Sequence, residues 1–497
     1  MNKGKLVKMD HLWGEPLQRC DMEKTKRKSP TEMPLPFQLD PEPTAEMLTG
    51  FAGAPLLIQA FRSLAGPAAV AEHVQVKQRE RGYDEATFVE SFLLLNAMGG
   101  ECLEDFERLR ADAGLAELIG HGVPSAEAAR KFLYEFHDEE KMEAAERQRQ
   151  SGQAAVIPEE SKPLVGLTKV NTALIGQIGD RCRDQKIATV DLDATIIESH
   201  KREALRTYEG ERGYQPMLAV WAETDLILTD QFRDGNVPAM YDPLTTAQRA
   251  FAALPASVNE FYFRGDSACY EKKLMHWLND PEREVGPKGF ISFAISVRIH
   301  PQLRAILEQI PDTEWKSAPA GDPNEIREYA EVPFEPWQPY EGKNQQSLRY
   351  LGIRIQPHQG ELFGSSAEVK HFAVVTNMSL APAKVIPWHR EKAGSIERIH
   401  DVLKNELAAG VLPCGRFGAN AAWFRLAVIS HNIITALKRI ALPAKYLAAR
   451  PKRMRFLFFH LPGRVVQHAR AMWLRIASLP QLIGEMQEAL QAFPLRS

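Results

Sequence analysis

The spacing of hydrophobic residues predicts that the chain begins with helices. After the first forty or so residues, apolar side chains recur every three or four positions, as at Phe88, Phe92 and Leu95, which is typical of amphipathic helices. Ser125 follows a glycine turn and precedes a short apolar pattern, so it is expected to cap a further helix. We therefore expect an all-helical domain over 41–140, either a plain scaffold or a DNA-binding domain that contains a helix-turn-helix.

Further along the chain the pattern changes to that of a sheet with helices. A polar linker at about 138–162 precedes an amphipathic helix, whose apolar positions are Leu164, Leu167, Val170, Leu174 and Ile178. A helix is also expected at 271–278. Strand patterns occur at 186–197, 215–222, 225–232, 258–265, 289–297 and 371–378. Strands with helices packed against them predict an α/β fold with a mixed sheet flanked by helices.

One internal segment differs in amino-acid composition from the segments on either side of it. Residues 305–368 carry clusters of proline, glycine and tryptophan, and residues 350–355 alternate between apolar and polar types, which predicts a strand-rich insertion. The regions after 378 are expected to be helical. The predicted domains are a flexible tail (1–40), a helical N-terminal DNA-binding domain (41–140), the first part of a catalytic core (160–304), a β-rich insertion (305–368), the last part of the core (369–440) and a basic C-terminal helical region (441–497).

Composition narrows the functional classes only a little. The 497 residues carry a formal charge of −3, so the overall charge indicates neither a nucleic acid nor a membrane as partner. The five cysteines are scattered and form no Cys-x-x-Cys pair, which argues against a zinc or redox site. The first residues lack an apolar core and no uninterrupted apolar stretch is long enough for a bilayer. We expect a cytoplasmic protein without membrane contact.

Carboxylates occur where the strand patterns call for buried residues. Asp191 and Asp193 lie two apart in Ile-Ala-Thr-Val-Asp-Leu-Asp-Ala-Thr, and Asp266 directly follows Phe-Tyr-Phe-Arg-Gly. Side chains two apart on a strand share a face, so neighbouring strands would bring two or three carboxylates together. Such a cluster needs a cation, and oxygen ligands favour Mg²⁺ or Mn²⁺. In the alternative interpretation each aspartate caps a turn or pairs with an arginine such as Arg264.

A third carboxylate is expected from a helix near residues 395–410. Ser395 is the expected N-cap and Gly410 the terminator. Glu397 and Lys404 lie seven residues apart, about two turns or ~10.5 Å along one face. The alternative is an ordinary solvated helix face.

Together these residues resemble the DDE transposases of bacterial insertion sequences. The order Asp-Leu-Asp-Ala-Thr, then Gly-Asp-Ser, then a helix with Glu and a Lys seven positions on is similar to the branch with a Tyr-Arg-Glu-Lys signature and a strand-rich insertion before the last acid. The resemblance implies a ribonuclease-H-like core in which three carboxylates hold two ions, Mg²⁺ or Mn²⁺. By position, Asp193 matches the first acid, with Asp191 as its alternative, Asp266 matches the second and Glu397 the third.

The sequence departs from that signature just before the last acid. The slot for the signature tyrosine holds Arg390 and the slot for its arginine holds Ala393. Either a one-residue insertion shifts the turn, or Arg390 and Lys392 contact DNA in their place. Lys404, at the spacing of the signature lysine, is also expected to contact DNA. Glu391 is the rival for the role of third acid.

The resemblance implies an enzyme of DNA transposition in the bacterial cytoplasm, associated with chromosomal DNA. It would cut double-stranded DNA at terminal inverted repeats and join the ends to target DNA, as a homodimer in the DNA complex. Two alternatives stay open: a catalytically inactive DNA-binding descendant of a transposase, and a metal-dependent nuclease that does not join strands.

A basic stretch supports a polyanionic partner. No Asp or Glu occurs from Leu407 to Gly484, so phosphate contact is expected there, most of all at Lys452, Arg453 and Arg455. The basic residues of this stretch are Arg416, Arg425, Lys438, Arg439, Lys445, Arg450, Lys452, Arg453, Arg455, Arg464, Arg470 and Arg475.

Aromatic residues of the insertion allow two interpretations. Trp315, Trp337 and Tyr340 either pack in the core or stack on an unpaired base of a DNA hairpin. Such a hairpin at the element ends is implied by the resemblance alone.

Overall fold

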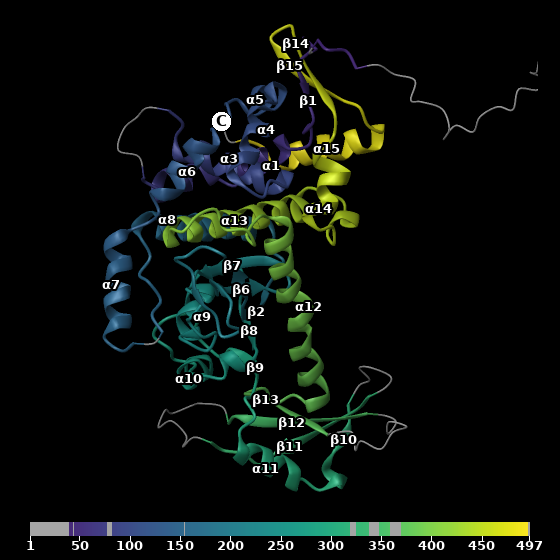
Figure 1. Ribbon diagram of the computed structural model, residues 1–497. Coiled ribbons are helices and arrows are strands. Elements are labelled where there is room, and N and C mark those ends of the chain that lie inside the picture. The colour runs from purple at the N-terminus through teal and green to yellow at the C-terminus, as the bar shows by residue number, and fades with distance from the viewer. Residues whose placement is uncertain are drawn as a thin grey trace, which may run out of the picture. The chain divides into compact units, whose positions relative to one another are not determined.

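The computed structural model describes residues 39–42, 44–76, 82–153, 155–318, 325–336, 347–357 and 369–495. The chain divides into two compact units, residues 1–46 and 47–497. Every described helix and strand belongs to the second unit (Figure 1). Across the described ranges, no helix has both the length and the apolar character that crossing a membrane requires.

A nine-stranded mixed sheet lies at the centre of the second unit. Its spatial order is β10-β11-β12-β13-β9-β8-β2-β6-β7. β2 pairs antiparallel with β6 and parallel with β8, which in turn pairs parallel with β9. The mixed sheet expected from the sequence is confirmed. Its strands are β2 (Ile187–Ala194), β6 (Met217–Trp221), β7 (Leu226–Gln231), β8 (Glu260–Gly265), β9 (Ser292–Ser296), β10 (Lys316–Ser317), β11 (Glu325–Val332), β12 (Arg349–Pro357) and β13 (Lys370–Thr376).

The strand-rich insertion continues this sheet. β10, β11, β12 and β13 pair antiparallel in succession, so the strand-rich character expected for the segment is confirmed. β13 joins the core through β9, where the paired residues are Val374 with Ser296, Val375 with Ile295 and Thr376 with Ala294. The helix α11 (Pro301–Gln309) lies beside these strands (Figure 1). Core and insertion therefore share one hydrogen-bonded ladder.

Two long helices separate the sheet from the N-terminal helices. α8 and α13 contact β7 on one side and the helices α2, α3 and α6 on the other (Figure 1). α13 is buried over almost its whole length, because the sheet packs against one side of it and the N-terminal helices against the other. Ser125 caps α6 as predicted, since its Oγ accepts from the Ala128 amide at 3.2 Å. These helices are α1 (Pro55–Ser63), α2 (Gly66–His73), α3 (Glu85–Met98), α4 (Phe106–Arg110), α5 (Ala113–Ile119), α6 (Ala126–Tyr134), α8 (Lys162–Arg181) and α13 (Phe417–Ile440).

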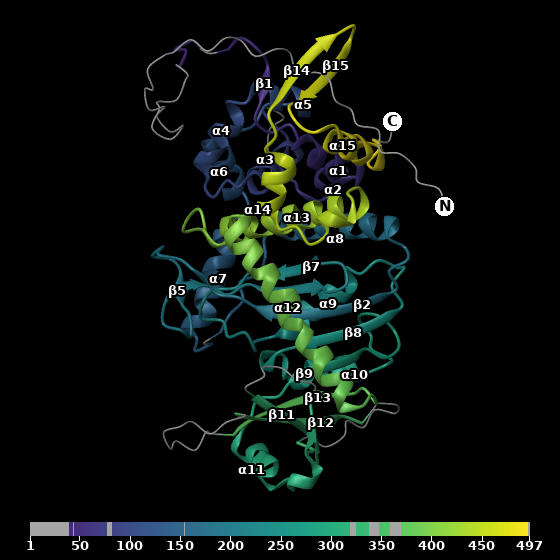
Figure 2. The same ribbon diagram turned by 90° about the vertical axis from the view of Figure 1, so that its right-hand side faces the viewer.

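Helices cover both faces of the sheet. α9 (Pro243–Ala252) and α10 (Lys272–Asn279) lie on one face, and α12 (Pro382–Glu406) crosses the other (Figures 1 and 2). α12 contacts β2, β8, β9 and the insertion strand β11. It therefore spans from the insertion to the helical part of the unit.

The predicted start of this helix at Ser395 is wrong. α12 begins at Pro382, which occupies its first position, and includes Pro387. Proline is well suited to a first helical position because its missing amide has no partner there. Ser395 lies inside the helix, where its hydroxyl donates to the Lys392 carbonyl at 3.1 Å, a bond that allows serine within a helix.

The predicted polar linker at 138–162 also contains a helix. α7 (Glu139–Gln150) is capped by Asp138, whose Oδ1 accepts from the Lys141 amide at 3.2 Å. Its residues are mostly Glu, Ala, Arg and Gln, which favour helix. Ion pairs within the helix, such as Arg149 with Glu146 at 3.0 Å, add a little stability. Because α7 has no apolar stripe, hydrophobic spacing could not indicate it.

Two smaller sheets complete the unit. β3 (Ile197–Glu198), β4 (Leu205–Arg206) and β5 (Arg212–Tyr214) form one. β1 (Leu48–Thr49), β14 (Gly463–His468) and β15 (Ala471–Ile476) form the other. The C-terminal region is helical as expected, in α14 (Pro451–Met454) and α15 (Pro480–Ala492), but the hairpin β14–β15 between them was not predicted.

A buried histidine in α13 predicts acid sensitivity. Burial lowers the pKa of His431 to about 4, against about 6.5 in an unfolded chain. The unfolded chain therefore binds a proton first as pH falls, and below pH 6.5 the unfolding free energy should drop by about 1.4 kcal/mol per pH unit until about pH 4. His431→Gln should reduce this slope in urea unfolding measured from pH 7 to 5, whereas the exposed His468→Gln should leave it unchanged.

Candidate active site

Two acidic residues lie at adjacent strand ends. Asp193 is near the C-terminal end of β2, and Asp266 follows the last residue of β8. The two strands are parallel neighbours, with Leu192 opposite Gly265. Because parallel strands end at the same edge of a sheet, the two carboxylates occupy one site. The predicted acidic site required these two strands to be neighbours in the sheet. The spacing of residues along the chain does not determine which strands pair.

A lysine from α12 lies between these carboxylates. The Nζ atom of Lys392 is 3.2 Å from Asp193 Oδ2, and the lysine is buried. Burial alone would lower the pKa of Lys392, but the carboxylates of Asp193 and Asp266 raise it above its ordinary value. Burial raises the pKa of Asp266, while Lys392 opposes that shift and Asp193 adds to it. The site thus holds one cation against two acids.

Asp191, the alternative first acid, is committed to a different contact. Arg264 donates to both of its carboxylate oxygens, at 2.6 and 2.9 Å, and the two side chains are 3% and 0% exposed. Ser395 Oγ also lies within hydrogen-bond distance of this carboxylate, so its single proton is shared between Asp191 and the Lys392 carbonyl. Arg264 also donates to the Trp388 carbonyl at 2.8 Å. This buried cluster fastens α12 onto β2 and β8 and so positions Lys392. The pairing with Arg264 that the alternative interpretation named occurs at Asp191.

The predicted third acid does not join the other two. Glu397 is exposed on α12 and makes no hydrogen bond or ion pair with any described residue. Among the side chains that the structure describes, no three Asp, Glu, His or Cys residues are grouped closely enough to hold a metal ion. Two of the three predicted acids, Asp193 and Asp266, therefore converge. Lys392 offsets only one of the two negative charges, so without a further cation the site repels a third carboxylate such as Glu397.

Glu391, the rival third acid, precedes Glu397 on α12, and Lys404, the signature lysine, follows it. Glu391 is 68% exposed, and its Oε2 accepts from Arg264 at 3.2 Å. Lys404 Nζ lies 3.1 Å from the carbonyl of Ile196, just beyond β2. The contact of Glu391 with Arg264 of β8 and that of Lys404 with the chain just beyond β2 therefore hold α12 against the sheet before and after Glu397.

Sequence reasoning missed how α12 faces the sheet. Lys392, Ser395 and His400 were not expected to lie together on its buried side, although Ser395 and His400 are three and eight positions after Lys392, spacings that fit one side of a helix. Neither ring nitrogen of His400 has a hydrogen-bond partner among the described residues, and burial lowers its pKa to about 3. A buried side chain without partners is costly, so His400 marks this part of α12 as unusual.

An open cleft of about 570 Å³ adjoins Asp266. Its lining residues come from the end of β9, the insertion strands β11, β12 and β13, and α12. Arg390, predicted to contact DNA, lines it together with Arg298 and Arg327. Its remaining lining is mostly apolar, with Ile353, Ile355 and Phe372. The cleft therefore offers positive charge next to the two acids.

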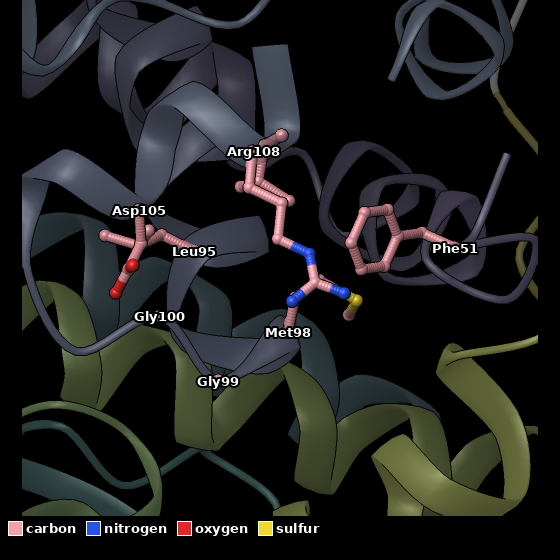
Figure 3. Close-up of a pocket in the computed structure, with 8 residues that line it drawn as sticks. Phe51, Leu95, Met98, Gly99, Gly100, Asp105 and Arg108 are labelled. Atoms are coloured by element: carbon pink, nitrogen blue, oxygen red, sulfur yellow. The ribbon is translucent and has the colours of Figure 1, made fainter. Parts of the chain in front are cut away.

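The predicted DNA contacts on α14 differ in exposure. Lys452 and Arg453 are exposed. Arg455 is instead bound to the carbonyls of Ala97, at 2.9 Å, and Glu406, so it joins α3 to α12. The neighbouring cavity at Gly99 holds only about 90 Å³ (Figure 3), well below the size of a nucleotide site.

Much of the acid-free stretch is structural. Internal contacts occupy Arg425, Lys438, Arg439, Lys445, Arg450 and Arg455, and Arg416 covers the ring of Tyr134 at 4.1 Å. The exposed members are Lys452, Arg453, Arg464, Arg470 and Arg475. Trp315 is buried beneath Arg354, at 4.7 Å, which favours core packing, while Trp337 and Tyr340 lie outside the described residues.

Comparison with known proteins identifies the family. The model of the family described as Transposase DDE domain group 1 matches residues 43–494. The cryo-EM structure of the piggyBac transposase synaptic complex with hairpin DNA is similar over 84% of this chain and 82% of that chain, with a TM-score of 0.44 and 12% identity. No curated protein sequence matches significantly. Because the family match spans nearly all of the sequence, the chain belongs to the family of transposases with a DDE domain of group 1.

Proposed function

We propose that this protein is a metal-dependent transposase that cuts double-stranded DNA at the terminal inverted repeats of an element and joins the ends to target DNA. Its acids would be Asp193, Asp266 and Glu397. It would act on chromosomal DNA in the cytoplasm, as a homodimer in the DNA complex. Beyond membership of the family, the proposal rests mainly on one observation: Asp193 and Asp266 lie on either side of a buried ammonium group.

The two carboxylates suit a hard cation. Lys392 Nζ places a positive charge 3.2 Å from Asp193 Oδ2 and close enough to Asp266 to oppose the rise that burial causes in the pKa of Asp266. Oxygen ligands of this kind bind Mg²⁺ or Mn²⁺. Two such ions, held by Asp193, Asp266 and Glu397, would supply Lewis-acid stabilisation of charge in an in-line phosphoryl transfer.

The residues around the site have separate tasks in this proposal. Arg264 and Asp191 keep α12 in register with the sheet, so that Lys392 stays beside Asp193. Arg298, Arg327 and Arg390 hold the DNA backbone in the cleft next to Asp266, since guanidinium groups bind phosphates well. Arg390 would thereby serve in place of the signature tyrosine.

The reaction products distinguish this function from its two alternatives. Purified protein is incubated with a labelled duplex that carries the inverted repeats flanking its own coding sequence, with Mg²⁺, with Mn²⁺ or with EDTA. Cleavage and joining to a plasmid only with metal supports transposition. Cleavage without joining indicates a nuclease, and binding without cleavage under any condition indicates an inactive DNA-binding protein; either outcome contradicts the proposal.

Lys392 should compete with metal ions for its two carboxylates. Lys392→Met is expected to bind Mn²⁺ roughly tenfold more tightly or better, because an ion pair of about 1.4 kcal/mol no longer has to be broken. Isothermal titration calorimetry on the protein without DNA measures this. Lys404→Met is the matched control, since Lys404 lies on the same helix and contacts a hydroxyl and a carbonyl instead. Weaker binding by Lys392→Met would show that the lysine assists metal binding.

A further inference from the structure

Three successive residues where β8 ends face one short part of α12. The residue before Gly265 donates to the Trp388 carbonyl at 2.8 Å, and the charge of Lys392 acts on the residue after it. Between these two, Nε2 of His389 lies 3.0 Å from the carbonyl oxygen of Gly265. The two outer interactions belong to the proposed function, whereas the middle one has no role in it.

The bond between His389 and Gly265 has a defined direction. A carbonyl oxygen can only accept a hydrogen bond, so Nε2 of His389 carries the proton and donates it. Ser296 Oγ of β9 lies 3.5 Å from the same nitrogen, longer than the usual hydrogen bond, so Gly265 is the principal partner. His389 also lines the cleft that adjoins Asp266. The imidazole therefore borders both the end of β8 and the cleft.

The peptide group that precedes Asp266 is held on several sides. A Cβ atom on Gly265 would lie 2.5 Å from Cβ of Cys269, so the chain is closely packed there. The strand itself pairs with β2 on one side and β9 on the other. The Gly265 carbonyl and the Asp266 amide lie in one rigid peptide plane. A hydrogen bond to that carbonyl therefore restricts the plane from which the Asp266 side chain extends.

We propose that His389 is a positioning residue for Asp266: by donating to the Gly265 carbonyl, its Nε2–H group keeps the Asp266 carboxylate in the orientation that receives a divalent cation. The inference rests on the proposed function, because that function makes Asp266 a metal ligand. Groups that hold metal ligands in place typically contribute about 10–100-fold to metal affinity or activity. His389 would contribute in this way without touching the reacting atoms.

Two substitutions of similar size separate the hydrogen bond from packing. His389→Gln keeps an N–H donor at a comparable distance from the backbone, His389→Met removes it, and both new residues favour helix. His389→Met should weaken Mn²⁺ binding and slow single-turnover cleavage, each by about 10-fold or more. DNA affinity in EDTA should stay within about twofold, because other residues contact the phosphates. His389→Gln should recover most of both losses.

Isothermal titration calorimetry on the full-length protein without DNA measures Mn²⁺ affinity, and thermal unfolding reports the Tm of each variant. His400→Met is the matched control, since it replaces another buried imidazole of α12, one whose ring nitrogens have no partner among the described residues. It should keep the Mn²⁺ affinity of the wild type.

Two results would overturn the inference. One is wild-type Mn²⁺ affinity in His389→Met. The other is an equal loss of affinity in His389→Gln and His389→Met together with an equal fall in Tm, which would assign His389 to packing alone. A wild type that binds Mn²⁺ but does not cut DNA would overturn the proposed function while leaving the calorimetric comparison valid. A wild type that binds no Mn²⁺ would overturn both.

Discussion

Asp266→Ala should lower the rate of metal-dependent DNA cleavage by about 10³-fold or more, because a ligand worth several kcal/mol of charge stabilisation is lost. DNA affinity should stay within about twofold, since phosphate contacts come from other residues. Rates are measured under single-turnover conditions on labelled ends, and affinity in Ca²⁺ or EDTA. Asp266 Oδ1 accepts from the Ala268 amide at 3.0 Å and so caps the short turn Ser267–Cys269. Losing this cap should cost about 1 kcal/mol, which the fold should tolerate.

Two glutamates on α12 provide a matched comparison for the third acid. Glu397→Ala should be as severe as Asp266→Ala, whereas Glu391→Ala should keep most of its activity. Both side chains are exposed and lie on one helix, so differences in folding are controlled. Should Glu391→Ala be the inactive variant, the third acid would be Glu391. Equal cleavage by the wild type and Asp266→Ala would place the chemistry elsewhere in the molecule.

Arg425→Met should lower the free energy of unfolding by about 3–5 kcal/mol, the usual cost of leaving a buried charge unpaired. Arg425 is fully buried in α13 and donates to Asp230 Oδ1 and Oδ2, both at 2.9 Å, and to Glu160 at 2.7 Å. Burial would lower the pKa of this guanidinium, but the two carboxylates raise it. The arginine therefore stays charged inside the protein and fastens α13 to β7 and to the segment before α8.

Chemical denaturation of two further variants completes this test. Lys452→Met removes an exposed charge from the same acid-free stretch and should change stability by less than about 0.5 kcal/mol. The double variant Arg425→Met/Asp230→Leu leaves fewer unpaired charges and should recover part of the loss. If Arg425→Met were as stable as the wild type but bound DNA poorly, the phosphate contact expected from sequence would be the better interpretation.

The convergence of Asp193 and Asp266 could be predicted because each residue ends a strand. Alternation along β2 and the glycine before Asp266 indicated where the strands stop, and parallel pairing did the rest. The role of Lys392 could not be predicted in this way. Its spacing from Glu397 suggested a contact with DNA, whereas its actual partner, Asp193, lies about two hundred residues earlier in the chain. A sequence shows that a charge is present, but long-range packing decides which charge it meets.

In the acid-free stretch from Leu407 to Gly484, too, local sequence did not identify the partners of the charged residues. Its lack of acids suggested phosphate contact, yet for Arg425 and Lys445 the partners are Asp230, Glu160 and Glu485 of the same chain. Local chemistry was more predictable than partner choice. The Ser125 cap and the buried stripe of α8 depend on residues a few positions apart, whereas α7 escaped because its helix lacks any apolar pattern.

The shared ladder between core and insertion has a mechanical consequence. The insertion cannot move as an independent domain, because β13 is hydrogen-bonded to β9 and β9 to β8. The last residue of β8 directly precedes Asp266. A movement of the insertion would reach the acids through the three residue pairs between β13 and β9. This is the shortest strand pairing between the insertion and the acids, so we expect the sheet to bend there.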